Sequence, residues 1–155
     1  MGINSNYLES RLYIGDLIEH KFRVFNTPYA VHTMEYNVFH NCDDRGMPAD
    51  RTHAMMNISI GLGENCIAKP FIEKMKDFDP SAFSLVFGGS VGKDNILVDF
   101  RNVIVFRAYV IDAEEEYSND GNGQTSTVLN VCLHLYDIDY VSKDKSSVKK
   151  LSIIH

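Results

Sequence analysis

The sequence predicts a mainly β fold: an antiparallel β-barrel of two packed sheets, with one short α-helix outside it and an extended loop. Three observations support this fold class. Alternation of apolar and polar residues with a period of two recurs along most of the chain. Two segments, residues 88–94 and 118–124, have the Gly- and Asn-rich composition of hairpin turns. A single segment, residues 69–78, has helical periodicity. A sheet that closes into a barrel would also leave no exposed edges.

Bulk composition indicates one soluble globular domain over residues 1–155. The chain is 45% hydrophobic and 23% charged, and its formal net charge of -6 disfavours binding to nucleic acid. Its three cysteines form no even disulfide framework and no C-x-x-C pair, which favours a reducing compartment during folding. The first residues lack the basic and apolar regions of a signal peptide, and no apolar run could span a bilayer.

Alternating segments in the first half predict four strands and a polar interruption between the last two. They are marked by Leu12 and Ile14; by Phe22 and Val24; by Met34, Tyr36 and Val38; and by Met56, Ile58, Ile60 and Leu62. The polar, turn-rich stretch of residues 40–52 separates the third strand from the fourth. We therefore expect this stretch to interrupt an otherwise regular hairpin and to contact something outside the barrel.

The predicted helix covers residues 69–78. Four apolar residues recur at spacings of four, four and three, which places them on one face: Ile67, Phe71, Met75 and Phe78. Pro70 suits the first turn, where its missing amide proton has no helical partner, and Pro80 ends the run. We expect the apolar face to pack on the core.

The second half predicts further strands around residues 83–87 and 96–100, and two long strands over 103–117 and 125–140. The turns at 88–94 and 118–124 would join them as hairpins. Bulky side chains are expected to fill the barrel: Phe22, Tyr36, Ile58, Phe83, Leu85 and Leu133. Residues 141–155 form a lysine-rich C-terminal tail, which we expect to be flexible or to contact a partner.

Three candidate ligand sites have simpler explanations. Residues 88–94 lack the Gly and the Ser or Thr that a phosphate-binding loop requires, and their flanks are strands, so a β-turn is favoured. Residues 119–123 lack the closing glutamate of a calcium loop. Zinc could in principle be held by a local set with distant histidines, but we interpret such strand histidines as hydrogen-bonded; the residues are His40, Cys42, Asp43, Asp44, His53 and His134.

Nothing in the sequence indicates catalysis. Cys132 lies within a predicted strand, and Cys66 near the helix start is most simply a packed or semi-exposed thiol. We therefore predict no catalytic, cofactor-binding or metal site. The acidic residues 114–116 and the basic residues 143–150 could meet in head-to-tail association of copies, although they also serve solubility.

From about residue 11 to residue 140 the chain resembles the haemolysin-coregulated protein (Hcp) family, the tube proteins of the bacterial type VI secretion system, in its divergent branch. The order and spacing of several segments carry the resemblance: the aromatic strand 36–40, Asp-Arg-Gly-Met-Pro at 44–48, the alternating strand 56–62, the helix, Ser-Leu-Val-Phe at 84–87, Val-Asp-Phe-Arg-Asn-Val at 98–103, Tyr117 with the following turn, and residues 125–131.

The resemblance implies a barrel subunit that forms hexameric rings, which stack into an inner tube that carries effectors and is propelled by a contracting sheath. The partners would be other copies of the chain and the sheath, spike and effector proteins, without nucleic acid or membrane insertion. The subunit would assemble in the bacterial cytoplasm and be secreted by the type VI apparatus, without enzymatic activity or a cofactor.

The resemblance also assigns the extended loop to subunit contacts. Its interface residues would be Asp43, Asp44, Arg45, Gly46, Met47, Pro48, Asp50 and Arg51. Met47 stands where this branch typically has Arg, and residues 50–53 replace the usual small residues. A monomeric β-barrel carrier of a small ligand is the alternative function, and an empty apolar cavity would favour it.

Overall fold

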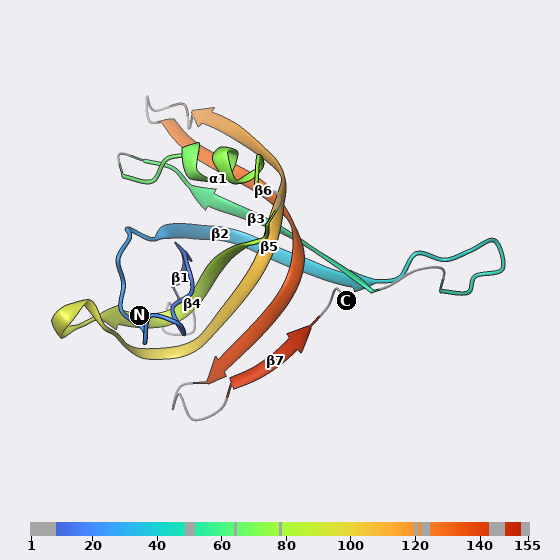
Figure 1. Ribbon diagram of the computed structural model, residues 1–155. Helices are drawn as coiled ribbons and strands as arrows, with labels where there is room; N and C mark the ends of the chain where they lie inside the picture. Colours follow the sequence, from blue (N-terminus) through green and yellow to red (C-terminus); the bar gives the residue numbers. More distant parts are fainter. Residues whose placement is uncertain are drawn as a thin grey trace, which may run out of the picture.

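The computed structural model describes residues 9–48, 52–63, 65–77, 79–119, 121, 125–142 and 148–152, the backbone alone for residue 125 and for 148–152. The elements in chain order are strands β1 (Ser10–Ile14), β2 (Tyr29–Phe39) and β3 (His53–Gly61), helix α1 (Lys69–Lys74), strand β4 (Ser81–Val91), the short 3-10 helix η2 (Lys93–Asn95), and strands β5 (Leu97–Asn119), β6 (Thr125–Ser142) and β7 (Val148–Ser152) (Figure 1). The predicted mainly β fold with one short helix is confirmed.

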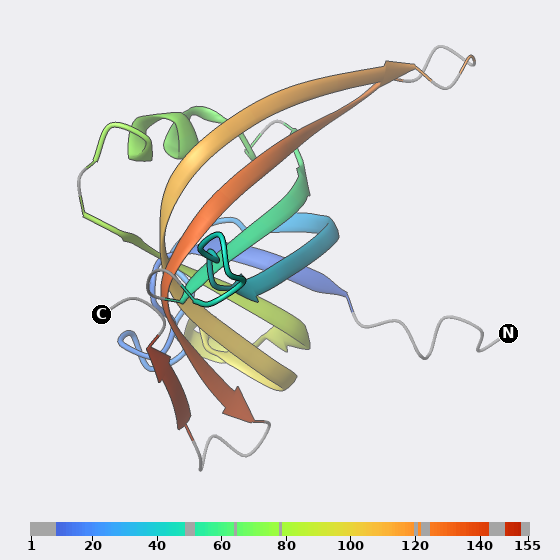
Figure 2. The same cartoon turned by 90° about the vertical axis from the view of Figure 1, so that its right-hand side faces the viewer.

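One antiparallel sheet closes on itself to form the barrel. Its strands follow the order β3-β2-β1-β4-β5-β6-β7, and β3 also pairs with β6, which closes a ring of the first six. Residues 128–134 of β6 pair with β3, whereas residues 137–141 of the same strand pair with β7. Strand β7 therefore pairs with the part of the β6 edge that β3 does not reach. Strands β5 and β6 curve over the barrel, and their paired ends near Asn119 and Thr125 extend beyond the body (Figure 2).

Alternating residues of the strands fill the barrel with an aromatic and aliphatic core. Phe83 of β4 lies at its centre, with its ring stacked on Phe71 at 5.8 Å and on Phe106 at 5.6 Å between centroids. Of the side chains predicted to fill the barrel, four are buried in this core: Ile58, Phe83, Leu85 and Leu133. Tyr36 is 41% exposed, because the outer half of β2 extends past the packed interior.

A second apolar cluster lies on the opposite face of β1, β4 and β5. Consecutive residues such as Leu85 and Val86 are therefore both buried, because the segment after β1 folds over the outside of the sheet. Ser84 fixes this segment: its buried hydroxyl accepts a hydrogen bond from the Leu17 amide and donates one to the Gly15 carbonyl, at 3.0 and 2.7 Å. A strand buried on both faces loses the simple alternation on which sequence reasoning depends.

The predicted strand around Phe22 and Val24 is wrong. These residues lie in a turn-rich segment whose single bridge joins Arg23 to Ile96. Phe22 has a φ of 66°, in the left-handed region, and its ring stacks on Phe100 at 5.3 Å. The two apolar residues therefore pack against the outside of the barrel wall and do not extend the sheet.

Helix α1 is shorter than the predicted 69–78, and its apolar face is not wholly buried. It spans six residues, Lys69–Lys74, with Pro70 in its first turn as expected. Phe71 is fully buried, but Ile67 and Met75 are 49% and 42% exposed. Phe78 lies outside the described residues. One buried side chain is enough to hold the helix on the barrel, because Phe71 packs between Phe83 and Tyr29. The Phe71 ring contacts the Tyr29 ring edge-on, with 5.2 Å between centroids.

Three predicted boundaries in the second half also change. Strand β4 continues through Gly88 and Gly89, where a register shift marks a bulge. At Gly89 φ is +80°, and a Cβ would lie 2.7 Å from the Val98 carbonyl oxygen, so only glycine fits. The segments predicted as separate strands at 96–100 and 103–117 form one strand, β5. Part of the predicted tail, Val148–Ser152, is the strand β7.

Candidate functional site

The outer halves of β2 and β3, together with residues 40–48 of the loop between them, project from the barrel, and we call this unit the arm. Figure 1 shows it extending to the right, well beyond the body. The pairing of β2 with β3 continues to the outer ends of both strands, where Phe39 lies opposite His53. The predicted interruption between two strands therefore exists, and a continuous two-stranded ribbon carries it away from the core.

Asp43 organises the tip of the arm. Its Oδ1 accepts hydrogen bonds from the backbone amides of Arg45 and Met47, at 2.9 and 3.0 Å. Its own amide donates to the Met47 carbonyl at 2.8 Å, and its carbonyl accepts from the Gly46 amide at 2.9 Å. Gly46 has a φ of 79°, a conformation that glycine adopts without strain. Aspartate and glycine thus shape the tip as a compact turn.

The tip presents its side chains to solvent. All six described residues of the predicted interface are exposed: Asp43, Asp44, Arg45, Gly46, Met47 and Pro48. Met47 is an apolar side chain with 59% of its surface exposed at this projecting point. Asp50 and Arg51, also predicted to contact a neighbour, lie outside the described residues. A role of the loop as a subunit interface remains a prediction.

Aromatic rings stack at the outer ends of β2 and β3 and connect them to β6. Phe39 of β2 stacks on His53 of β3, and His53 stacks on His134 of β6, with centroid separations of 5.6 and 5.4 Å. His53 Nδ1 and His134 Nε2 are 3.3 Å apart and share a hydrogen bond. Burial, and secondarily the nearby His53, lower the pKa of His134, which favours its neutral form. Sequence reasoning left these two histidines isolated from each other.

A tyrosine pair also links the arm to the barrel. The hydroxyls of Tyr36 on β2 and Tyr140 on β6 are hydrogen-bonded at 3.1 Å. Burial, the hydrogen bond from Tyr36 and the charge that Tyr36 would carry raise the pKa of Tyr140 to about 12. The base of the arm therefore contacts β6 through a polar pair and through stacked rings.

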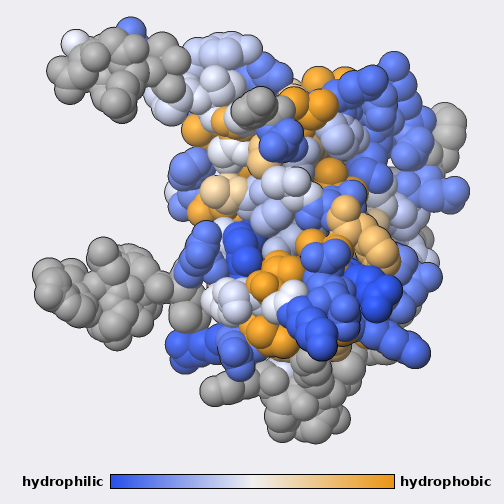
Figure 3. All heavy atoms as spheres, turned by 90° about the vertical axis from the view of Figure 1, so that its left-hand side faces the viewer, coloured by the Kyte–Doolittle hydropathy of each residue, from blue (hydrophilic) through white to orange (hydrophobic). Residues whose placement is uncertain are grey.

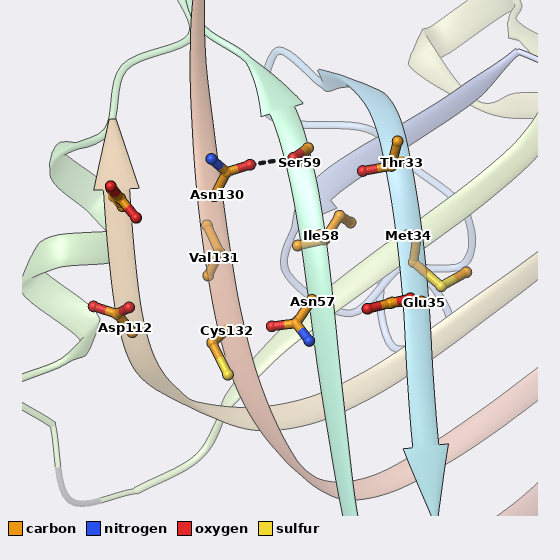
Figure 4. A pocket seen from close by; sticks show the side chains of 11 residues that line it. Thr33, Met34, Glu35, Asn57, Ile58, Ser59, Asp112, Asn130, Val131 and Cys132 are labelled. Atoms are coloured by element: carbon orange, nitrogen blue, oxygen red, sulfur yellow. Dashed lines mark hydrogen bonds between the residues drawn. The ribbon is translucent and has the colours of Figure 1, made fainter. Parts of the chain in front are cut away.

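A polar groove of about 520 Å³ lies on the outer face of β5, β6, β3 and β2 (Figure 4). Its lining includes three carboxylates, Glu35, Asp112 and Glu114. Ser59 and Asn130 are hydrogen-bonded across the β3–β6 pair in its floor. These side chains alternate with the buried residues of the same strands, so the groove is outside the barrel. It is open and acidic, unlike the enclosed apolar pocket of a small-ligand carrier.

Two cysteines that sequence reasoning considered as nucleophiles are placed as packed thiols. Cys132 lies in the groove, and burial and the neighbouring Asp112 raise its pKa, which opposes formation of the reactive thiolate. The Cys66 thiol donates a hydrogen bond to the Pro28 carbonyl at 3.3 Å. Neither environment activates a nucleophile.

Exposed apolar side chains are distributed over several elements. Three of them, Ile67, Ile72 and Met75, lie in or beside α1, with between 42% and 49% of their surface exposed. On the face seen in Figure 3, apolar groups alternate with hydrophilic ones and form no single large patch. Such a surface suits several small contacts better than one extended apolar interface.

The described part of the chain lacks two further kinds of feature. No group of three or more His, Cys, Asp and Glu side chains there could hold a metal ion. No helix in the same residues is long and apolar enough to cross a membrane.

The closed barrel with its one short helix is the fold of Hcp structures, the tube proteins of type VI secretion. The sequence itself matches no family model and no curated protein. Among solved structures, the chain matches Hcp1 from Flavobacterium johnsoniae with 13% identity and a TM-score of 0.55, over 93% of this chain and 98% of that one. It matches an Hcp protein with 8% identity and a TM-score of 0.60 over the same shares. A tryptophan double variant of Hcp1 from E. coli EAEC 042 pathovar has 10% identity and a TM-score of 0.60, over 94% and 98%.

Proposed function

We propose that this chain is a structural subunit of a type VI secretion inner tube, which assembles into hexameric rings that stack and carry effectors. The observation that supports it most is the likeness to Hcp structures over 98% of their length, with no large part of the fold missing. Residues 1–155 would act as a single Hcp-like domain. Self-association would be the function, so the subunit needs no catalytic residue and no cofactor.

The shape of the arm supports an assembly role. A ribbon that leaves the core exposes backbone and side chains without contributing to the packing of its own barrel, which is costly unless a partner covers it. Its tip is held in one conformation by Asp43, so little conformational entropy is lost when it docks. Exposed Met47 supplies an apolar contact, and the neighbouring Asp44 and Arg45 supply charged ones.

The surface near α1 supports a second contact. Ile67, Ile72 and Met75 are half exposed around a helix that a single aromatic ring anchors to the barrel. Distinct arm and helix surfaces on one subunit are compatible with head-to-tail contacts, which close into rings when the rotation between copies is right. Sheath, spike and effector proteins would be the further partners, and the subunit would pass from the bacterial cytoplasm through the apparatus.

The monomeric carrier is the weaker alternative. A carrier needs an enclosed apolar cavity inside the barrel. Among the described residues, Phe83 and the rings stacked on it fill that space. The 520 Å³ groove is on the outer face and carries carboxylates. A carrier of apolar ligands would need an enclosed pocket lined mainly by apolar side chains.

Size-exclusion chromatography with light scattering, combined with negative-stain imaging, tests the proposal. The wild-type protein is expected as a hexamer, and as rings or short stacks on the grid. A protein that stays monomeric over the whole concentration range, and shows no rings, would refute the tube function.

A pair of substitutions at Met47 tests the arm separately from the ring. Met47→Asp places a charge in the proposed apolar contact and should reduce stacking or ring formation, whereas Met47→Leu keeps an apolar side chain of similar volume and should assemble like the wild type. Because the side chain is 59% exposed, both variants should keep the wild-type circular dichroism and melting temperature. Equal assembly of the two variants would show that the tip of the arm is not part of the interface.

A further inference from the structure

Two histidines from distant parts of the sequence meet on the outer face of the barrel. His53 is the first residue of β3, in the outer half that belongs to the arm, and His134 lies in β6. The register pairs Met55 with His134, so His53 is the diagonal neighbour of His134 on the same face. Each ring directs one nitrogen at the other, and His53 Nδ1 and His134 Nε2 are 3.3 Å apart.

This separation is the one that a shared metal ion requires. Two imidazole nitrogens bound to a tetrahedral ion at about 2.05 Å lie roughly 3.3 Å from each other. The two strands are hydrogen-bonded neighbours, which limits how far the rings can separate. Stacking of Phe39 on His53 further restrains one of the rings. The pair is therefore preorganised, and an ion would replace the proton that the two nitrogens now share.

We propose that His53 Nδ1 and His134 Nε2 form a two-imidazole site for a late first-row transition-metal ion. Water would complete the coordination shell. Imidazole suits zinc, nickel and copper, and affinities in this series are highest for Cu²⁺. Magnesium and calcium, which require oxygen ligands, would not occupy the site.

Met55 gives the site a preference for copper. It lies directly opposite His134 in the β3–β6 register, so the two residues leave the sheet on the same side. Thioether sulfur is a soft ligand that favours Cu(I) and adds little for zinc. We therefore expect Met55 to affect copper binding more than zinc binding.

The location of the site gives the ion a structural effect. Pairing of β3 with β6 is the contact that closes the barrel, and His53 is the first residue of β3, next to the loop of the arm. An ion bridging the two strands would cross-link this closure and hold the base of the arm. Metal binding should therefore raise the thermal midpoint of the folded chain, and the increase should grow with the logarithm of the free metal concentration.

Isothermal titration of the full-length, untagged protein with Zn²⁺ and Cu²⁺ tests the site, with Mg²⁺ as the hard-cation control. We expect one ion per chain for Zn²⁺ and Cu²⁺ and none for Mg²⁺. Affinity should fall by about tenfold or more in His53→Gln and in His134→Gln. The matched control is His32→Gln, which removes an exposed histidine from β2 and should leave the affinity unchanged.

A second measurement does not depend on the variants folding. Electron paramagnetic resonance of the Cu²⁺-loaded wild-type protein should show coupling to two imidazole nitrogens, and Met55→Leu should weaken Cu(I) binding while leaving Zn²⁺ binding within twofold. Coupling to one imidazole or none would overturn the proposal. Affinities of His53→Gln and His134→Gln within twofold of wild type would overturn it as well, because the ion would then bind elsewhere.

Discussion

Replacing Phe71 by alanine should detach helix α1 from the barrel. Phe71 is the helix residue that is fully buried, and its ring contacts Tyr29 edge-on and stacks on Phe83. A helix of six residues has no stability of its own in water, because nucleation costs more than so few hydrogen bonds return. The packing of this one ring therefore determines whether α1 forms.

The size of the effect follows from burial. Truncation of a fully buried phenylalanine to alanine costs about 3–5 kcal/mol, which combines lost transfer free energy with the cavity that remains. For a chain of this length each kcal/mol lowers the melting temperature by about 2–4 °C, so we expect a decrease of roughly 10 °C. Ile72→Ala in the same helix is the matched control: Ile72 is 46% exposed, and its truncation should cost about 1 kcal/mol or less.

Urea denaturation followed by circular dichroism measures the free energy of unfolding of both variants and the wild type. Light scattering on the same samples reports assembly, since a detached helix would also displace the apolar residues around it. Equal destabilisation by Phe71→Ala and Ile72→Ala would show that the Phe71 ring does not anchor the helix.

Three further perturbations test the arm and its base. Asp43→Ala removes the acceptor of two backbone hydrogen bonds at the exposed tip, so hydrogen exchange at the tip should accelerate while the melting temperature stays within about 2 °C of wild type; slow exchange would exclude Asp43 as the organiser. Tyr36→Phe removes the hydroxyl partner of Tyr140, so the highest tyrosine pKa in a spectrophotometric alkaline titration should move below its wild-type value of about 12; an unchanged titration curve would contradict the pairing. Because the pKa of His134 is lowered in the folded state, the unfolded chain binds the proton more tightly, and stability should fall as the pH drops below about 6.5 and through the folded-state pKa. His134→Gln should reduce this dependence, and an identical pH profile would argue against the burial of the imidazole.

Local patterns in the sequence were sufficient for the elements whose residues face one environment along their length. Strand β3 is the clearest example, since its core residues alternate without exception from Ala54 to Ile60. The loop of residues 40–52 was also correctly placed between two strands, and the second hairpin turn was placed two residues too early, since β5 continues to Asn119. Gly, Asn and Asp give these signals because they permit backbone conformations that strands exclude.

Patterns failed where a second layer of packing changed the environment. Phe22 alternates with Val24 as in a strand, yet it packs on the outside of the barrel against Phe100. Met75 continues the helical spacing from Phe71, but the helix ends at Lys74 and leaves Met75 exposed. In both cases contacts with residues distant in the sequence determined the backbone conformation, and a pattern over a few neighbouring residues does not include them.

The sequence by itself determined that this chain is an antiparallel β protein with a polar, turn-shaped arm, because side-chain alternation and turn composition act between residues that are close along the chain. Only the tertiary structure decided how the barrel closes. Pairing of β3 with β6 joins residues 67 to 79 positions apart, and it creates both the acidic outer groove and the meeting of His53 with His134. Contacts between residues so far apart in the sequence depend on how all the strands of the sheet pair. They can therefore be identified only from the complete tertiary structure.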